Sequence, residues 1–237
     1  MAIDDLEAEQ DELEALLAAL TPAQWRSPSA AEGWTVADTV LHLAQTEERV
    51  PVALSEAEPA LGWEQFGDTI DDAMAAMVRA QPAEPAQTFA RWRAARRASV
   101  AALRAADPGR AVFWAVAPLK PRTLATTRLA EHWAHGLDIT GPLGIDRPDT
   151  ARLRHIAWLA HSTLPWVMEA AVPVFCDLAG PGGESWPLGD PAAESVISGS
   201  AGAFCRVGAQ RLTPAASGLK TSGPYAEKAL AVLRTYA

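Results

Sequence analysis

The chain has few of the features that mark a secreted or a membrane protein. Its 237 residues include only two cysteines, Cys176 and Cys205, which are too few for a disulfide framework and lack the paired spacing of a zinc knuckle. No apolar run approaches the roughly 20 residues that span a bilayer. The acidic start at Asp4 and Asp5 is the opposite of the basic start of a signal peptide. We therefore expect a cytoplasmic protein with two buried thiols and no membrane partner.

The sequence also lacks an excess of positive charge. Its net charge is −9 at pH 7, whereas binding to nucleic acid needs a basic face that neutralises phosphates. Hydrophobic residues make up 49% of the chain, which at this length is enough for one large domain or two modest ones. These properties exclude a disordered chain and nucleic acid as a general partner. They favour a folded protein that acts on a small molecule.

Helical periodicity dominates the first two thirds of the sequence. Leucines from Leu6 to Leu20 form one apolar stripe, and the acidic residues face away from it. Thr35 and Asp38 resemble a capping box, and Pro51 is expected to end the helix that begins there. The predicted helices cover residues 3–20, 35–50, 71–80, 85–106, 121–140 and 152–168.

The pattern changes after residue 168. Hydrophobic residues alternate from Val172 to Leu178, as in a half-buried strand, and Ser195–Gly199 predicts another strand before two helical stretches. The predicted fold class is α+β. We expect an N-terminal up-down four-helix-type bundle over residues 1–168 and a small α+β domain over residues 169–237.

Two residues on the helix after Pro121 are candidate metal ligands. Glu131 and His135 are four positions apart, so their side chains lie on one face of the helix, one turn from each other. A carboxylate and an imidazole suit a divalent ion such as zinc. His42, on the helix that follows Thr35, can supply a third ligand, because facing helices of a bundle bring inward polar side chains together. An ordinary surface contact is the alternative interpretation of the Glu-x-x-x-His pair by itself.

The sequence around these residues resembles that of a known family. Residues 33–45, with His42, and residues 131–138, with Glu131 and His135, are similar to DinB-like metal-binding bundles. Within these they resemble the mycothiol-dependent maleylpyruvate isomerase group. The resemblance implies a zinc site formed by His42, Glu131 and His135, and mycothiol as a co-substrate. It also implies a C-terminal domain reminiscent of sterol-carrier folds.

The resemblance implies a reaction as well. A metal-bound thiolate is expected to add to an electrophilic small molecule, which gives either cis-trans isomerisation or thiol S-transfer. One alternative is a thiol-independent metal-dependent hydrolase, lyase or cyclase on the same scaffold. Another is a non-catalytic protein that binds a hydrophobic ligand and carries a structural metal. Three ligands argue against the last alternative, because structural zinc is normally closed by four protein ligands.

Several further residues are weighed as parts of the site. Arg211 is predicted to bind the cofactor and, with Arg206, to reach over the site from the second domain. Asp138 either fixes the tautomer of a ligand imidazole or forms a salt bridge at the helix end. The other residues are expected to be structural or surface groups. They are the histidines His132, His155 and His161 and the tryptophans Trp34, Trp92, Trp114 and Trp133, which are expected in the bundle core. The arginines Arg91, Arg93, Arg96, Arg97 and Arg104 either bind a carboxylate of mycothiol or of a dicarboxylic substrate or, more simply, pair with the acidic first helix.

Overall fold

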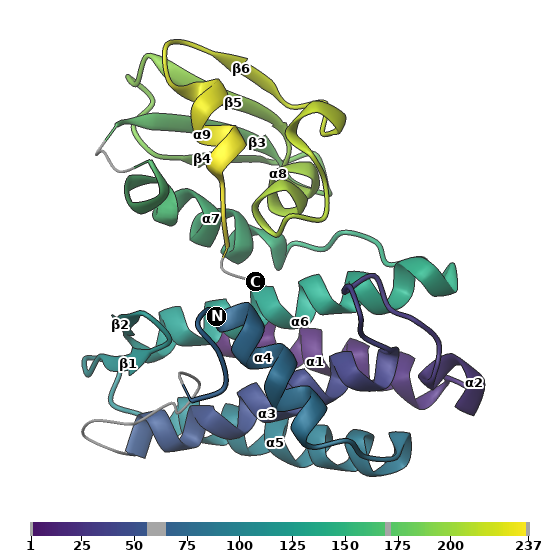
Figure 1. Ribbon diagram of the computed structural model, residues 1–237. Coiled ribbons are helices and arrows are strands. Elements are labelled where there is room, and N and C mark those ends of the chain that lie inside the picture. The colour runs from purple at the N-terminus through teal and green to yellow at the C-terminus, as the bar shows by residue number, and fades with distance from the viewer. Residues whose placement is uncertain (1, 56–64, 169–171, 236–237) are drawn as a thin grey trace. The chain divides into compact units, whose positions relative to one another are not determined.

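The computed structural model describes residues 2–55, 65–168 and 172–235. The chain divides into two compact units, Met1–Asp146 and Arg147–Ala237 (Figure 1). Helix α7 (Leu153–Val167) packs against helices α8 (Ala201–Gly208) and α9 (Ala226–Val232) of the second unit. The division therefore falls before α7, whereas the sequence placed the domain boundary after it.

The first unit is a bundle of four long helices with short elements added. Helix α3 packs against α5 and α6, and α1 packs against the same two helices. Leucines of α1, such as Leu6 and Leu13, are fully buried in this core. The long helices are α1 (Ala2–Ala18), α3 (Val36–Ser55), α5 (Pro85–Ala105) and α6 (Pro121–Leu143). The short elements are α2 (Pro22–Trp25), α4 (Ile70–Ala80), β1 (Val112–Trp114) and β2 (Ala117–Leu119).

The predicted capping box fixes the start of α3. The backbone N–H of Thr35 donates to the Asp38 carboxylate at 2.9 Å, and the Asp38 N–H donates to Thr35 Oγ1 at 3.2 Å. The prediction that Pro51 ends this helix is wrong, because α3 continues to Ser55. Proline removes one backbone hydrogen bond, but Val50 and Ala53 on either side of it are fully buried in the core, and their burial offsets that loss.

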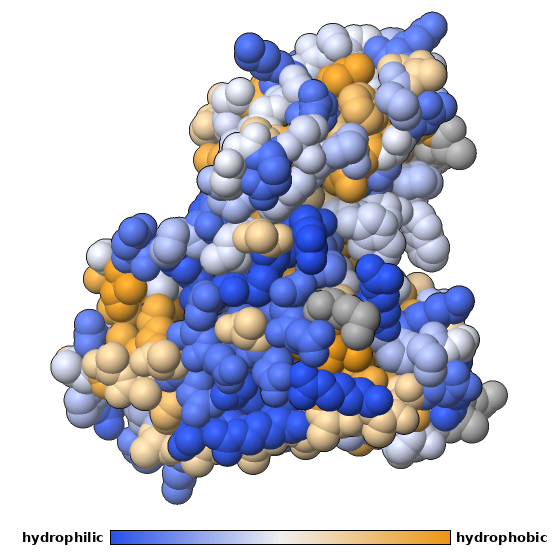
Figure 2. Space-filling view, turned by 180° about the vertical axis from the view of Figure 1, so that it is seen from behind, coloured by the Kyte–Doolittle hydropathy of each residue, from blue (hydrophilic) through white to orange (hydrophobic). Residues whose placement is uncertain are grey.

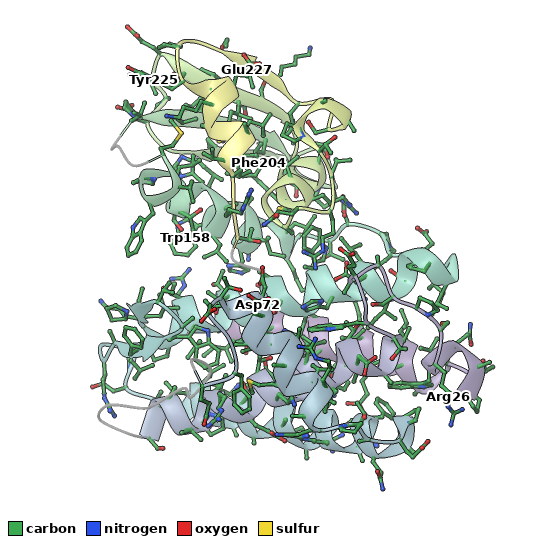
Figure 3. All side chains as sticks on the ribbon, viewed as in Figure 1. Arg26, Asp72, Trp158, Phe204, Tyr225 and Glu227 are labelled. Carbon is green, nitrogen blue, oxygen red and sulfur yellow. The ribbon has the colours of Figure 1, made fainter. Side chains whose placement is uncertain are left out.

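In the described part of the second unit, one small sheet is combined with three α-helices, so the α+β class is confirmed. Its strand order is β4-β3-β5-β6, in which β3 and β5 are parallel and the outer pairings are antiparallel. Phe204 of α8 lies inside this unit (Figure 3) and is fully buried. The strands are β3 (Val174–Ala179), β4 (Ser185–Leu188), β5 (Ser195–Ser200) and β6 (Lys220–Ser222). Besides α7, the unit contains α8 (Ala201–Gly208), the 3-10 turn η1 (Pro214–Ala216) and α9 (Ala226–Val232).

Both thiols lie in the protein interior, whereas the face of the first unit shown in Figure 2 is largely hydrophilic. Cys176 and Cys205 are buried free thiols, and burial raises the pKa of Cys176 to about 12 and also raises the pKa of Cys205. Figure 2 shows hydrophilic side chains over much of one face of the first unit, with apolar residues scattered among them. No helix in the described residues is long and apolar enough to cross a bilayer.

A buried ion pair joins α6 to α3. Arg128 Nε donates to Glu47 Oε1 at 2.7 Å, and Arg128 Nη2 donates to Thr46 Oγ1 at 2.7 Å. The exposed fractions of the Arg128 and Glu47 side chains are 3% and 0%. The guanidinium also lies 5.6 Å from the centre of the Trp114 ring. Separating the two side chains would leave each charge unpaired in the core, which is strongly destabilising. The pair therefore fixes how α3 and α6 align.

We predict that Arg128→Met lowers the free energy of unfolding by about 3–5 kcal/mol, because it leaves the Glu47 carboxylate buried without its cation. The double variant Arg128→Met, Glu47→Met is expected to regain much of this loss. Urea unfolding of the metal-free protein measures both effects. Arg97→Met, at an exposed ion pair, is the control and should cost less than about 1 kcal/mol. A double variant no more stable than Arg128→Met contradicts the stranded-charge explanation.

Candidate metal centre

Three side chains from two helices converge in the first unit. His42 comes from α3, whereas Glu131 and His135 come from α6. Glu131 Oε2 lies 3.4 Å from His42 Nε2 and 3.6 Å from His135 Nε2. The ligand atoms of all three residues lie within 4.8 Å of one another. The structure therefore brings together the three residues that the sequence predicted as metal ligands.

The three side chains are largely buried, and their surroundings favour the protonation states that can bind a metal ion. The exposed fractions of the side chains are 7% for His42, 13% for Glu131 and 9% for His135. Burial lowers the pKa of His42. Burial alone would raise the pKa of Glu131, but the hydrogen bond to His42 and the Arg128 guanidinium lower it to about 2. A neutral imidazole and an ionised carboxylate are the forms that coordinate a cation.

Asp138 orients one of the ligand rings. Its Oδ2 lies 2.9 Å from Nδ1 of His135, and the residue is 2% exposed. We assign the proton of this contact to Nδ1, since a carboxylate can only accept. The lone pair of His135 Nε2 then faces Glu131 and is available to a metal. This is the role in tautomer selection that the sequence left open beside a simple salt bridge.

Trp34 is a residue of the site that sequence reasoning missed. It was expected in the bundle core, but its ring centre lies 5.1 Å from that of His42 and 6.1 Å from that of His135. The two imidazole rings are themselves 4.9 Å apart. Of the sequence signals, only its place directly before the cap of the helix that carries His42 could have indicated this contact.

His132 has a structural place behind the site, as expected. Its Nδ1 donates to the Arg128 carbonyl oxygen at 2.8 Å. Its Nε2 accepts from Trp92 Nε1 at 3.2 Å and from Gln10 Nε2 at 3.4 Å. The ring is fully buried, and burial lowers the pKa of His132 to about 4. The neutral ring thus joins α1, α5 and α6 by hydrogen bonds.

The arginines of α5 pair with acidic residues, as the simpler of the two interpretations predicted. Arg93 and Arg96 both donate to Glu14 of α1, and Arg104 donates to Asp4 and Glu7 of the same helix. Arg97 lies 3.5 Å from Glu14. Arg91 donates to Glu48 of α3. These ion pairs join neighbouring helices of the bundle, and the pair of Arg96 with Glu14 is largely buried.

The remaining candidates lie in the second unit. Arg206 pairs with Asp149 at 2.8 Å, and Arg211 donates to the Ala209 carbonyl oxygen. His161 Nε2 donates to the Val174 carbonyl oxygen at 2.9 Å, which is a structural contact. His155 is half-buried on α7. A cofactor-binding role for Arg211 stays a prediction.

Comparisons with known proteins agree with this arrangement. Residues 6–140 match the model of the mycothiol maleylpyruvate isomerase N-terminal domain. An uncharacterized protein, found in two strains of Mycobacterium tuberculosis, is 33% identical over 249 residues, which cover 99% of this chain and 95% of that protein. The chain is therefore a two-part α+β protein with a DinB-like helical part. It belongs to the mycothiol maleylpyruvate isomerase family.

Solved structures show the same fold. A crystal structure of the mycothiol-dependent maleylpyruvate isomerase superposes with a TM-score of 0.66 at 17% identity, covering 94% of this chain and 95% of that chain. A mutant of that isomerase gives a TM-score of 0.64 at 16% identity, with the same coverage. At these identities the likeness concerns the fold, and it extends over both units.

We predict that Asp138→Ala weakens zinc binding about 10- to 100-fold, because the His135 ring loses the acceptor that fixes its tautomer. Competition with a chromophoric chelator measures the affinity. Asp71→Ala, which removes an exposed carboxylate of α4, is the matched control and should leave the affinity unchanged. Equal affinities for the Asp138 and Asp71 variants would show that the hydrogen bond to His135 does not support metal binding.

A pH dependence follows from the lowered pKa of His132. In the unfolded chain the His132 imidazole has the ordinary histidine pKa of 6.5, whereas burial in the folded protein lowers this pKa to about 4. The unfolded state therefore binds more protons between these values, and stability falls on acidification at up to about 1.4 kcal/mol per pH unit. Urea unfolding of the metal-free protein should show this slope, and His132→Asn should make it shallower. An unchanged slope in the variant contradicts the assignment.

Proposed function

We propose that His42, Glu131 and His135 bind one divalent metal ion, zinc, in an enzyme that uses a thiol. The observation that carries the proposal is the convergence of two imidazole nitrogens and one carboxylate oxygen in a largely buried site. Within the described residues, no fourth histidine, cysteine or acidic side chain joins this cluster. Because structural zinc sites normally have four protein ligands, three ligands favour a reactive site with an open coordination position.

The residues of the site fit this ion, and each would have a different role in binding it. His42 and His135 offer neutral nitrogens, and Glu131 offers a negative oxygen that offsets part of the charge of the cation. Asp138 keeps the His135 ring turned toward the ion. Once bound, zinc lowers the pKa of a coordinated thiol, so that the thiolate forms at neutral pH.

The reaction that this site supports best is addition of a thiol to an electrophilic double bond. A carbon–sulfur bond forms, and the π electron pair moves onto the neighbouring conjugated atoms. Rotation about the resulting single bond, followed by loss of the thiolate, gives the other geometric isomer. Uptake of a proton instead gives the thiol S-conjugate. Membership of the family supports mycothiol as the thiol, and we propose that Arg211 contributes to binding it.

We predict that His42→Ala and His135→Ala each remove most of the zinc from the purified protein, because each leaves only two ligands. His155→Ala, on α7 of the second unit, is the matched control and should retain the wild-type content. Elemental mass spectrometry on protein purified without a histidine tag measures metal per chain. Equal zinc content in all three variants would contradict the assignment of His42 and His135 as ligands.

The choice of chemistry needs a separate assay. The zinc-loaded protein is incubated with cis-unsaturated acids, with and without mycothiol, and isomers and S-conjugates are separated by chromatography. Conversion that needs both zinc and mycothiol supports the proposal. Zinc-dependent turnover of esters, amides or unsaturated acids without any thiol would favour the hydrolase, lyase or cyclase alternative. Arg211→Ala is expected to raise the KM for mycothiol and to leave the zinc content unchanged.

A further inference from the structure

Backbone hydrogen bonds fix the conformation of the loop before α3, which carries Trp34. Its two ends meet at an isolated β-bridge between Pro28 and Thr35. The backbone N–H of Ser29 donates to the Trp34 carbonyl oxygen at 2.9 Å, and the Trp34 N–H donates to the Ala31 carbonyl oxygen at 3.1 Å. Gly33 has a φ of +77°, a conformation that glycine adopts without strain. Hydrogen bonds on both sides of its peptide therefore fix the Trp34 backbone.

The same loop is tied to the helix that carries two of the ligands. The backbone N–H of Ala30 donates to the Asp138 carbonyl oxygen of α6 at 2.8 Å. The side chain of Asp138 meanwhile accepts from His135. One residue of α6 therefore anchors the loop through its backbone and orients a ligand ring through its side chain.

Trp34 packs on the two histidine ligands at once. Its ring is inclined by 44° to the His42 ring and by 30° to the His135 ring, while the two imidazoles lie edge to face at 72°. The tryptophan is half-buried, whereas both histidines are buried. The three rings thus form one packed cluster, in which a change of tilt in either imidazole disturbs the indole.

The two histidines differ in what fixes their rings. His135 has the hydrogen bond to Asp138, but Nδ1 of His42 is buried and has no hydrogen-bond partner among the described residues. No hydrogen bond therefore holds the His42 ring from the side opposite its coordinating nitrogen. On that side of the ring, packing is the remaining constraint on its rotation, and the Trp34 ring lies against it.

We propose that Trp34 is a positioning residue of the metal centre, which fixes the tilt of the His42 ring so that the two histidine Nε2 atoms and Glu131 Oε2 converge on one ion. This inference rests on the proposed function only in that the site binds a metal, and it needs neither the thiol nor the reaction. A ring fixed by packing reaches the ion without reorganisation, so its loss weakens binding and loosens the coordination geometry.

The test compares Trp34→Phe, Trp34→Leu and Trp34→Ala with the wild type. Zinc affinity is measured by chelator competition, and the visible absorption of the cobalt(II)-substituted protein reports the coordination geometry. Trp34→Ala is expected to weaken zinc binding at least about tenfold and to reduce the strong absorption of low-coordinate cobalt. Trp34→Phe should restore most of both properties because it keeps a ring. Trp34→Leu, which keeps apolar volume without a ring, should fall between them and serves where Trp34→Ala does not fold.

Trp166→Ala is the control, since it removes an exposed indole of α7 in the other unit. Circular dichroism and thermal unfolding of the metal-free proteins confirm that each variant is folded. Wild-type zinc affinity and an unchanged cobalt spectrum in folded Trp34→Leu and Trp34→Ala would overturn the positioning role while leaving the metal site intact. A wild-type protein that binds neither ion would overturn both this inference and the proposed function.

Discussion

The candidate site depends on how α3 and α6 are aligned, and a buried ion pair fixes that alignment. Arg128 reaches from α6 to Glu47 and Thr46 of α3. It lies about one turn before Glu131, and Glu47 lies a little more than one turn after His42. A slip of one residue between the helices would separate Arg128 from Glu47 and His42 from Glu131 together. A buried ion pair is costly to desolvate, and the position of this one between α3 and α6 gives it a role in their alignment.

Arg128 also links the scaffold to the electrostatics of the site. Its guanidinium is one of the charges that lower the pKa of Glu131, and its backbone carbonyl accepts from His132. A carboxylate this deeply buried would otherwise tend to take up a proton. The charge that aligns the helices therefore also helps to keep the Glu131 carboxylate ionised. Arg128 thus contributes both to the packing of α3 against α6 and to the negative charge of Glu131.

The sequence predicted the parts of the site that depend on local spacing. Glu131 and His135 share a helical face in any regular helix, and the capping box of Thr35 and Asp38 set the start of α3. His42 was joined to them through a family motif. The contact of Trp34 with both histidines was only weakly indicated, because it depends on a loop that a backbone hydrogen bond joins to α6 between Ala30 and Asp138, which lie far apart in the sequence. The hairpin β1–β2 escaped notice because three-residue strands are too short to show periodicity.

The two histidines of the candidate site illustrate two ways of fixing a side chain, and these have different consequences. A hydrogen bond such as that between His135 and Asp138 sets the tautomer as well as the direction of the ring, so it depends on protonation. Packing such as that between His42 and Trp34 sets direction alone and does not depend on charge. The packed ring also lies in a loop-to-helix contact, whereas the hydrogen-bonded ring lies within one helix. A change in the sequence of this loop can therefore alter the geometry of the site without changing His42, Glu131 or His135.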